Sequence, residues 1–147
     1  MFAPLLLVLV LPPQDPVGPG AFAGNFPSYV DGLRWDSVVG RQHLEASPRW
    51  REDEESPPLA PRAAVRAARA TLQQIHFPQS GSGTWKVHRV TLTQLAVVDA
   101  WIYVVEFLPL PKPPPAGASG VIAGPVTSLV QIVVLMNGRA IVPVPHP

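Results

Sequence analysis

The amino-acid sequence predicts an α+β fold in which one main helix packs on a four-stranded antiparallel sheet, preceded by an irregular N-terminal segment. Three observations support this class. Residues Leu59–Ile75 read as one amphipathic helix. Four stretches rich in β-branched and aromatic residues follow it. The last two stretches are joined by Asn137-Gly138, a dipeptide typical of a tight β-hairpin turn.

The 147 residues suit a single domain with its own core, and their composition excludes several functional classes. The chain has no cysteine, which excludes disulfides, thiolate catalysis and cysteine-ligated metal centres. A net charge of +1 provides no long-range field that would steer nucleic acid. The 20 prolines fall in clusters, which we interpret as breaks between elements. We therefore expect no nucleic-acid partner, and no motif in the chain predicts a cofactor.

Residues 1–23 are typical of a signal peptide. The unbroken apolar run Leu5–Leu11 has the length of a signal-peptide core and is too short to span a bilayer as a helix. Ala21-Phe22-Ala23 provides the small residues of a cleavage site, which predicts a mature chain that begins at Gly24. The positive charge that usually precedes such a run is missing. We expect an exported protein (periplasmic, cell-envelope or secreted) that meets a membrane only through this signal.

Residues 24–58 show no regular period and are predicted to form an irregular segment that ends in an acidic linker. Asp36 is a candidate cap for a short helix over Ser37–Ala46. The charge run Glu52–Glu55 reads as a solvated linker. The α+β domain is then expected to occupy residues 59–147.

The main helix is predicted from its residue types and from the spacing of its apolar residues. Pro61 suits a first helical turn, and the interior is rich in strong helix formers. One narrow apolar stripe recurs at three- and four-residue spacing, namely Val65, Ala68, Leu72 and Ile75. A second face carries Arg62, Arg66, Arg69 and Gln73. We interpret this face as solvated, because three arginines in a nearly neutral chain are a weak signal for phosphate binding.

Two strands are predicted directly after the helix. Along Trp85–Leu95 the apolar residues change from one face to the other, which predicts a β-bulge near Arg89. The stretch Ala96–Ala100 is expected to turn the chain into a second strand, Trp101–Leu110, that pairs antiparallel with the first.

A Pro/Gly-rich loop over residues 109–124 leads to the C-terminal hairpin, Ser128–Val144. Its turn is expected to be type I′, with positive φ at both Asn137 and Gly138. Proline cannot donate a hydrogen bond to a neighbouring strand, so the last strand is expected at a sheet edge that ends near Pro143.

Both faces of the predicted sheet are apolar, as the alternating side chains of Trp101–Leu110 and Leu129–Met136 show. One helix with a narrow stripe covers only one of these faces. The second face must be covered by the N-terminal segment with Trp35 and Trp50, by another chain, or by a ligand.

The order of helix and strands, with the segments WIYVVEF and VVLMNGRAIVP, resembles the PepSY and cystatin-like group of small exported α+β domains. The resemblance covers residues 59–144. It implies a binding or inhibitory module outside the cytoplasm. The chain departs from this group in its long Pro-rich loop, and the inhibitory motif Q-x-V-x-G of cystatins is absent.

The candidate ligand-binding residues are Trp101, Tyr103, Phe107, His88 and Glu106. The three aromatic residues would line a concave sheet face. His88, Asp99 and Glu106 lie on adjacent strands and in the turn between them, where an acid–base pair would be placed. Their spacing is not selective, so we favour a simple cross-strand pair and predict no catalytic residue. The histidines lack zinc-ligand spacing, so no metal site is predicted.

Three functional interpretations remain open. We favour a non-catalytic exported or cell-envelope module that binds a protein or peptide through an open sheet face or the edge strand Arg139–Val142. The alternative is a small-ligand binder or pocket enzyme, of nuclear-transport-factor-like shape, that uses the concave face. Filling of that face by Trp35 or Trp50 would contradict this alternative. The third interpretation is a structural domain without a discrete site.

Overall fold

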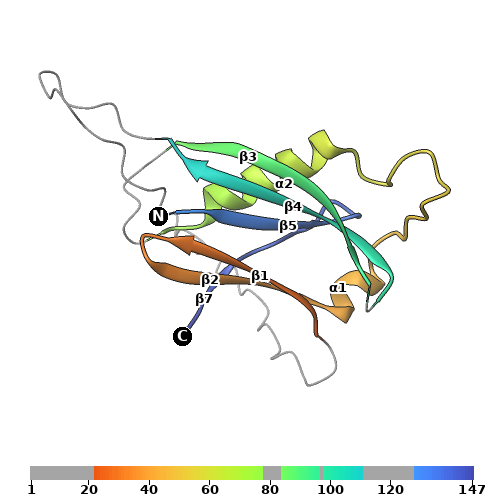
Figure 1. The fold of residues 1–147 in the computed structure, drawn as a ribbon, viewed down its shortest axis with the longest axis horizontal. Coiled ribbons are helices and arrows are strands. Elements are labelled where there is room, and N and C mark those ends of the chain that lie inside the picture. The colour runs from red at the N-terminus through yellow and green to blue at the C-terminus, as the bar shows by residue number, and fades with distance from the viewer. Residues whose placement is uncertain (1–21, 78–83, 97, 111–127) are drawn as a thin grey trace, which may run out of the picture.

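The described residues form two antiparallel β-sheets and two helices, so the predicted class of one helix on one sheet is wrong. The computed structural model describes residues 22–77, 84–96, 98–110 and 128–147. Their elements are β1 (Phe22–Val30), β2 (Leu33–Gly40), α1 (Arg41–Glu45), α2 (Pro61–Gln74), β3 (Trp85–Leu95), β4 (Ala100–Pro109), β5 (Val130–Leu135), β6 (Ala140–Ile141) and β7 (Val144–Pro145). One sheet has the strand order β1-β2-β7 and the other β3-β4-β5-β6 (Figure 1).

The largest difference from the prediction is at the N-terminus, where β1 and β2 form a hairpin instead of an irregular segment. Val30 pairs with Leu33 across the two-residue turn Asp31-Gly32. Asp31 has a φ of 50° and Gly32 a φ of 81°. Positive φ at both central residues is the mark of a type I′ turn, and Asp-Gly is one of the dipeptides that favour it. The Asp31-Gly32 dipeptide is therefore the local sequence signal for this hairpin.

The short helix predicted over Ser37–Ala46 forms only as α1, Arg41–Glu45. Asp36, expected as its cap, lies inside strand β2. Three side chains on one face of β2 are buried, namely Trp35, Ser37 and Val39, as the two-residue period of a strand requires, and Asp36 on the other face is buried as well.

The main helix and the first strand pair agree with the prediction. Helix α2 begins at Pro61 and buries one stripe of residues, Ala64, Ala68 and Leu72. Strands β3 and β4 pair antiparallel, and their register shifts between Val87 and Arg89. This shift confirms the predicted bulge.

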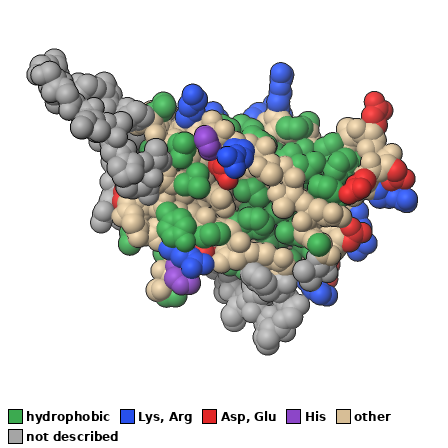
Figure 2. Space-filling model, viewed as in Figure 1, with side chains coloured by type: hydrophobic (Ala, Val, Ile, Leu, Met, Phe, Trp, Pro, Cys, Tyr) green, Lys and Arg blue, Asp and Glu red, His purple; other side chains and the backbone are tan. Residues whose placement is uncertain are grey.

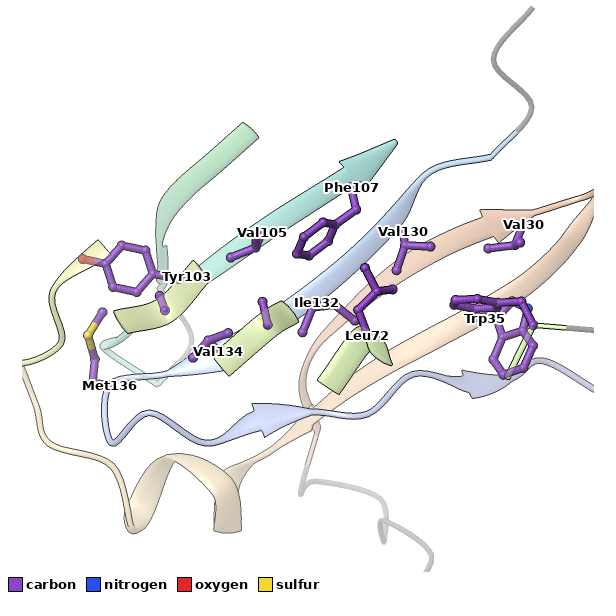
Figure 3. Packing of buried hydrophobic residues seen from close by; sticks show 13 residues of the cluster. Val30, Trp35, Leu72, Tyr103, Val105, Phe107, Val130, Ile132, Val134 and Met136 are labelled. Carbon is purple, nitrogen blue, oxygen red and sulfur yellow. The ribbon is translucent and has the colours of Figure 1, made fainter. Parts of the chain in front are cut away.

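The four-stranded sheet is covered on both faces. Figure 3 shows Tyr103, Val105 and Phe107 of β4 beside Val130, Ile132 and Val134 of β5, in the core that these strands share with Leu72 of α2. The opposite face packs against the N-terminal hairpin and α1, through Val39, Leu44, Leu95, Ile102, Val104, Val133, Leu135 and Ile141. The N-terminal segment therefore covers the second face, which was one of the three arrangements that the sequence left open. The two tryptophans expected to do this do not: Trp35 belongs to the cluster shared with α2, and Trp50 packs against Trp101 beside that cluster.

The two sheets are joined where β1 lies beside the start of β5. Tyr29 and Leu129 exchange two backbone hydrogen bonds, of 2.8 and 2.7 Å. The hydroxyl oxygen of Ser28 accepts a hydrogen bond from the backbone N–H of Gln131 at 2.8 Å, and the hydroxyl of Ser37 donates to the Gln131 carbonyl at 3.3 Å. Ser28 and Ser37 are both fully buried. The side chains of the hairpin thus satisfy the backbone of β5 where no full strand pairing is formed.

The C-terminal hairpin is present at Asn137-Gly138, but its turn is not type I′. The N–H of Gly138 donates to the carbonyl of Leu135 at 2.9 Å, and Gly138 has a φ of 84° while Asn137 keeps a negative φ. This geometry is typical of a type I turn followed by a glycine bulge. Asn137 acts through its side chain instead, since its Oδ1 accepts a hydrogen bond from the N–H of Arg139 at 3.0 Å.

We expect Gly138→Val to lower the free energy of unfolding by about 1–3 kcal/mol, because a β-branched residue is strained at positive φ. The nearest atom to an added Cβ is Leu59 Cδ1 at 3.8 Å, so the effect is conformational and not a clash. Gly138→Asn is the control, because asparagine tolerates positive φ better and should lose less stability. Urea unfolding followed by tryptophan fluorescence measures both variants. A valine variant as stable as the wild type would contradict the left-handed turn.

Candidate functional site

The structure places two of the five predicted ligand-binding residues in the hydrophobic core. Tyr103 is 2% exposed and Phe107 is fully buried, and both share a core cluster with helix α2 (Figure 3). The hydroxyl of Tyr103 donates a hydrogen bond to the carbonyl of Leu59 at 2.9 Å, and burial raises the pKa of this phenol. The ring of Trp50 packs edge-on against Trp101, with centroids 4.9 Å apart. At Tyr103 and Phe107, the face on which the small-ligand interpretation depends is therefore filled by the protein's own side chains, while Trp101 stays partly exposed.

The other predicted residues, His88 and Glu106, are not brought together. Because His88 occupies the bulge, Arg89 is the residue that pairs with Glu106. Arg89 Nε lies 3.6 Å from Glu106 Oε2, and Glu106 Oε1 accepts a hydrogen bond from Gln131 Nε2 at 3.3 Å. Asp99 lies at the far end of β4, in the turn that follows β3. The arrangement is a cross-strand ion pair and not an acid–base pair of His88 with Asp99 or Glu106.

A different group of residues forms a cleft of about 190 Å³ where the C-terminal segment crosses from one sheet to the other. Its apolar side chains are Val38, Val144 and three residues of the predicted binding edge Arg139–Val142, namely Ala140, Ile141 and Val142. At one end of the cleft, Val144 of β7 pairs with Asp36 of β2 in the sheet. At the other end, the positive charge of Arg139 lies close enough to His43 to lower the pKa of its ring. Apolar walls with a few convergent polar groups are typical of binding sites.

Asp36 carries the polar contacts at the first end of the cleft. Its Oδ1 accepts hydrogen bonds from Arg34 Nε at 2.9 Å and from Asn25 Nδ2 at 3.3 Å. Its Oδ2 lies 2.7 Å from His146 Nδ1. Burial by itself would raise the pKa of Asp36, but the hydrogen bonds from Arg34, His146 and Asn25 outweigh it and hold this pKa below its ordinary value. Asp36 is thus ionised, and its charge is already paired within the protein.

We expect the free energy of unfolding to decrease at acidic pH because Asp36 becomes protonated. Its folded pKa lies below the ordinary value of 3.8, so the ionised carboxylate stabilises the fold above that value. This contribution is lost as the pH falls through the lowered folded pKa. The Asp36→Asn variant should lose this part of the dependence. Melting temperatures between pH 7 and about pH 2 measure it, and parallel curves for the two proteins would contradict the assignment.

His43 and Arg139 lie at the second end. The Nδ1 atom of His43 accepts a hydrogen bond from the backbone N–H of Gly40 at 3.1 Å, which places the proton of the neutral ring on Nε2. Burial, and then the positive charge of Arg139, lower the pKa of His43. The ring is therefore neutral at pH 7. The guanidinium of Arg139 forms no ion pair with any carboxylate in the part of the chain that the structure describes.

Sequence reasoning identified the edge segment Arg139–Val142 but missed His43 and the contact between Asp36 and His146. The two partners of that contact are 110 positions apart, so no local spacing could indicate it. The Asp31-Gly32 turn was the one useful signal, because it would have identified β2 as a strand and Asp36 as part of it.

Comparison of the chain with known protein families, curated proteins and solved structures gives no significant match. The resemblance to the PepSY and cystatin-like group therefore stays a prediction. Among the residues described here, none of the helices has the length and apolar character needed to cross a membrane. The same residues contain no group of three His, Asp or Glu side chains that could hold a metal ion. Most of the predicted signal peptide, residues 1–21, and of the Pro-rich loop, residues 111–124, lies outside the described part.

Proposed function

We propose that the chain is an exported, non-catalytic module that binds an extended peptide carrying a carboxylate at the edge segment Arg139–Val142. The observation that carries the proposal is the Arg139 guanidinium, which lines a cleft of mixed polar and apolar walls without a carboxylate partner among the described residues. Since His43 is neutral, the charge of Arg139 is available to an anionic group. Export rests on the apolar run Leu5–Leu11 and the cleavage pattern before Gly24.

The edge position favours an extended partner. Strand β6 pairs with β5 and is the last strand of its sheet. Such an edge offers backbone N–H and C=O groups to an added strand. Val142 and Val144, which follow β6, are 50% and 44% exposed and offer apolar contact to alternate side chains of the partner. Because β6 has only two residues, backbone pairing alone is weak and the cleft must contribute selectivity.

The volume of the cleft is large enough for one side chain, or one terminus, of a bound peptide. This volume of about 190 Å³ is below the range of roughly 300–1,000 Å³ that is usual for drug-sized ligands. A carboxylate at the second end would accept paired hydrogen bonds from Arg139 and a further one from Nε2–H of His43. Both faces of the four-stranded sheet are covered, by α2 and by the N-terminal hairpin, so the proposal uses the edge and not a face.

Selection of a displayed random peptide library on the full chain, followed by titration of the selected peptides, tests this proposal. We expect enrichment of Asp, Glu or a free C-terminus next to apolar residues. Arg139→Gln should weaken binding about tenfold or more, because it removes a charge-assisted hydrogen bond. Arg62→Gln is the matched control, since Arg62 is exposed on α2 and the charge change is the same.

Melting curves of both variants show whether folding is preserved. Selected peptides without a carboxylate, or equal affinities of the Arg139 and Arg62 variants, would contradict peptide recognition at this cleft. The mass of the protein recovered outside the cytoplasm of the expression host tests export, with an N-terminus at Gly24 as the expected result.

A further inference from the structure

A second cavity, of about 180 Å³, is lined by residues of helix α1, of the segment that follows it, and of the turn between β3 and β4. Figure 1 shows α1 close to this turn. We call it the α1 cavity. It has no lining residue in common with the cleft at Arg139. Its binding properties can therefore be tested independently of the proposed peptide site. In Figure 2 the visible face is largely hydrophobic at its centre, and acidic side chains gather at the end where the segment between α1 and α2 lies.

The charged groups of the α1 cavity favour one negative charge on a ligand. Arg41 and Arg49 both line it, and neither forms an ion pair within the described part of the chain. Glu45 also lines the cavity and offsets one of the two positive charges. Arg51, the next cation along the chain, forms an ion pair with Asp53, with Nε of Arg51 lying 3.1 Å from Oδ1 of Asp53. The balance of one positive charge suits a monoanion better than a dianion.

One hydroxyl group in the wall of the cavity has no hydrogen-bond partner among the described residues. Ser47 lines the cavity, and its Oγ is buried without a hydrogen-bond partner among the described residues. Buried hydroxyl groups are almost always hydrogen-bonded in folded proteins. The backbone N–H of Ser47 donates to the carbonyl of Leu44 at 3.0 Å, which holds the residue in a fixed turn after α1. The backbone of Ser47 is therefore fixed beside the cavity, and its hydroxyl donates to an anionic oxygen of a ligand once the side chain rotates toward the cavity.

The remaining wall is apolar and includes an aromatic ring. Leu44, Val98 and Trp101 line it, and Trp101 is braced by the ring of Trp50 at 4.9 Å. A flat apolar group can pack against an indole in a stacked or edge-on arrangement. The volume of the cavity is below the usual range of roughly 300–1,000 Å³ for drug-sized ligands, which limits the ligand to about one ring.

We propose that the α1 cavity binds a monocarboxylate with a single flat apolar group, through the two arginines Arg41 and Arg49, the hydroxyl of Ser47 and the ring of Trp101. The carboxylate lies between the guanidinium groups, and the apolar group packs on Trp101. This chemistry is shared by free aromatic acids and by the C-terminal residue of a peptide that ends in an aromatic amino acid.

Titration of the full chain, followed by the indole N–H resonances of Trp50 and Trp101, tests this proposal. The probes are phenylacetate, the peptide Gly-Gly-Phe, and the neutral isostere phenylacetamide, with acetate to balance ionic strength. We expect saturable shifts with at least one of the two acids and none with the amide. Whichever acid saturates at the lower concentration identifies the source of the carboxylate.

Arg41→Gln and Arg49→Gln should each weaken binding about tenfold, and Ser47→Ala about threefold. Arg62→Gln and Arg139→Gln should leave the titration unchanged, which separates this site from the proposed peptide cleft. Binding of the amide as tightly as the acids, absence of a saturable shift, or equal effects of the Arg49 and Arg62 variants would overturn the proposal.

Discussion

Replacement of Phe107 by alanine is expected to lower the free energy of unfolding by about 3–5 kcal/mol, the usual range for deleting a buried aromatic side chain. Phe107 is fully buried, lies on β4 opposite Val130 of β5, and shares its core cluster with Leu72 of α2 (Figure 3). The substitution removes its apolar contacts and leaves a cavity that neighbouring strands cannot collapse to fill.

Denaturant unfolding of wild type and variant measures this loss. Leu110→Ala is the control, because Leu110 is 43% exposed and its truncation should change stability by no more than about 0.5 kcal/mol. A Phe107 variant as stable as the Leu110 variant would instead support the surface ligand site that the sequence predicted there.

Ser28→Ala is expected to destabilise the protein by about 1–3 kcal/mol, although it removes only one oxygen atom. This oxygen accepts a hydrogen bond of 2.8 Å from the backbone N–H of Gln131, and Ser28 is fully buried. Without it this N–H is left unpaired between the N-terminal hairpin and β5, where water cannot replace the lost partner.

The matched control is Ser47→Ala, whose buried hydroxyl has no partner among the described residues and should cost less than about 0.5 kcal/mol. Hydrogen exchange at the Gln131 amide gives a second measurement, since exchange should accelerate in the Ser28 variant alone. Equal stability of the two variants would show that the contact of Ser28 with β5 does not hold the sheets together.

The parts of the fold that were predictable are those encoded by neighbouring residues. The helix-forming residues after Pro61, the apolar alternation of β3 and the bulge near Arg89 follow from spacings of one to four residues. The Asn137-Gly138 hairpin was predicted correctly, but its turn type was not, because the two dipeptide positions are compatible with more than one hairpin geometry.

The candidate site was much less predictable. The side chains of Trp101–Phe107 point alternately to the two faces of a strand. This alternation does not show whether the aromatic side chains face a pocket or a helix. The contact of Asp36 with His146 depends on β7 returning to pair with β2. Only the edge segment Arg139–Val142 was identified in advance, because Pro143 prevents its strand from continuing.

The sequence by itself determined the local elements: one alanine-rich helix, long β-branched strands, and two Gly-containing turns that reverse the chain. The tertiary structure decided that the N-terminal residues form a second sheet, that this sheet covers one face of the first, and that Asp36, His43 and Arg139 line one cleft. The reason is that turns and helices depend on dihedral preferences of adjacent residues. The pairing of strands and the packing of one sheet on another depend instead on apolar surfaces and hydrogen-bonding groups that lie far apart in the sequence. Ser28 and Gln131, for example, are about 100 residues apart.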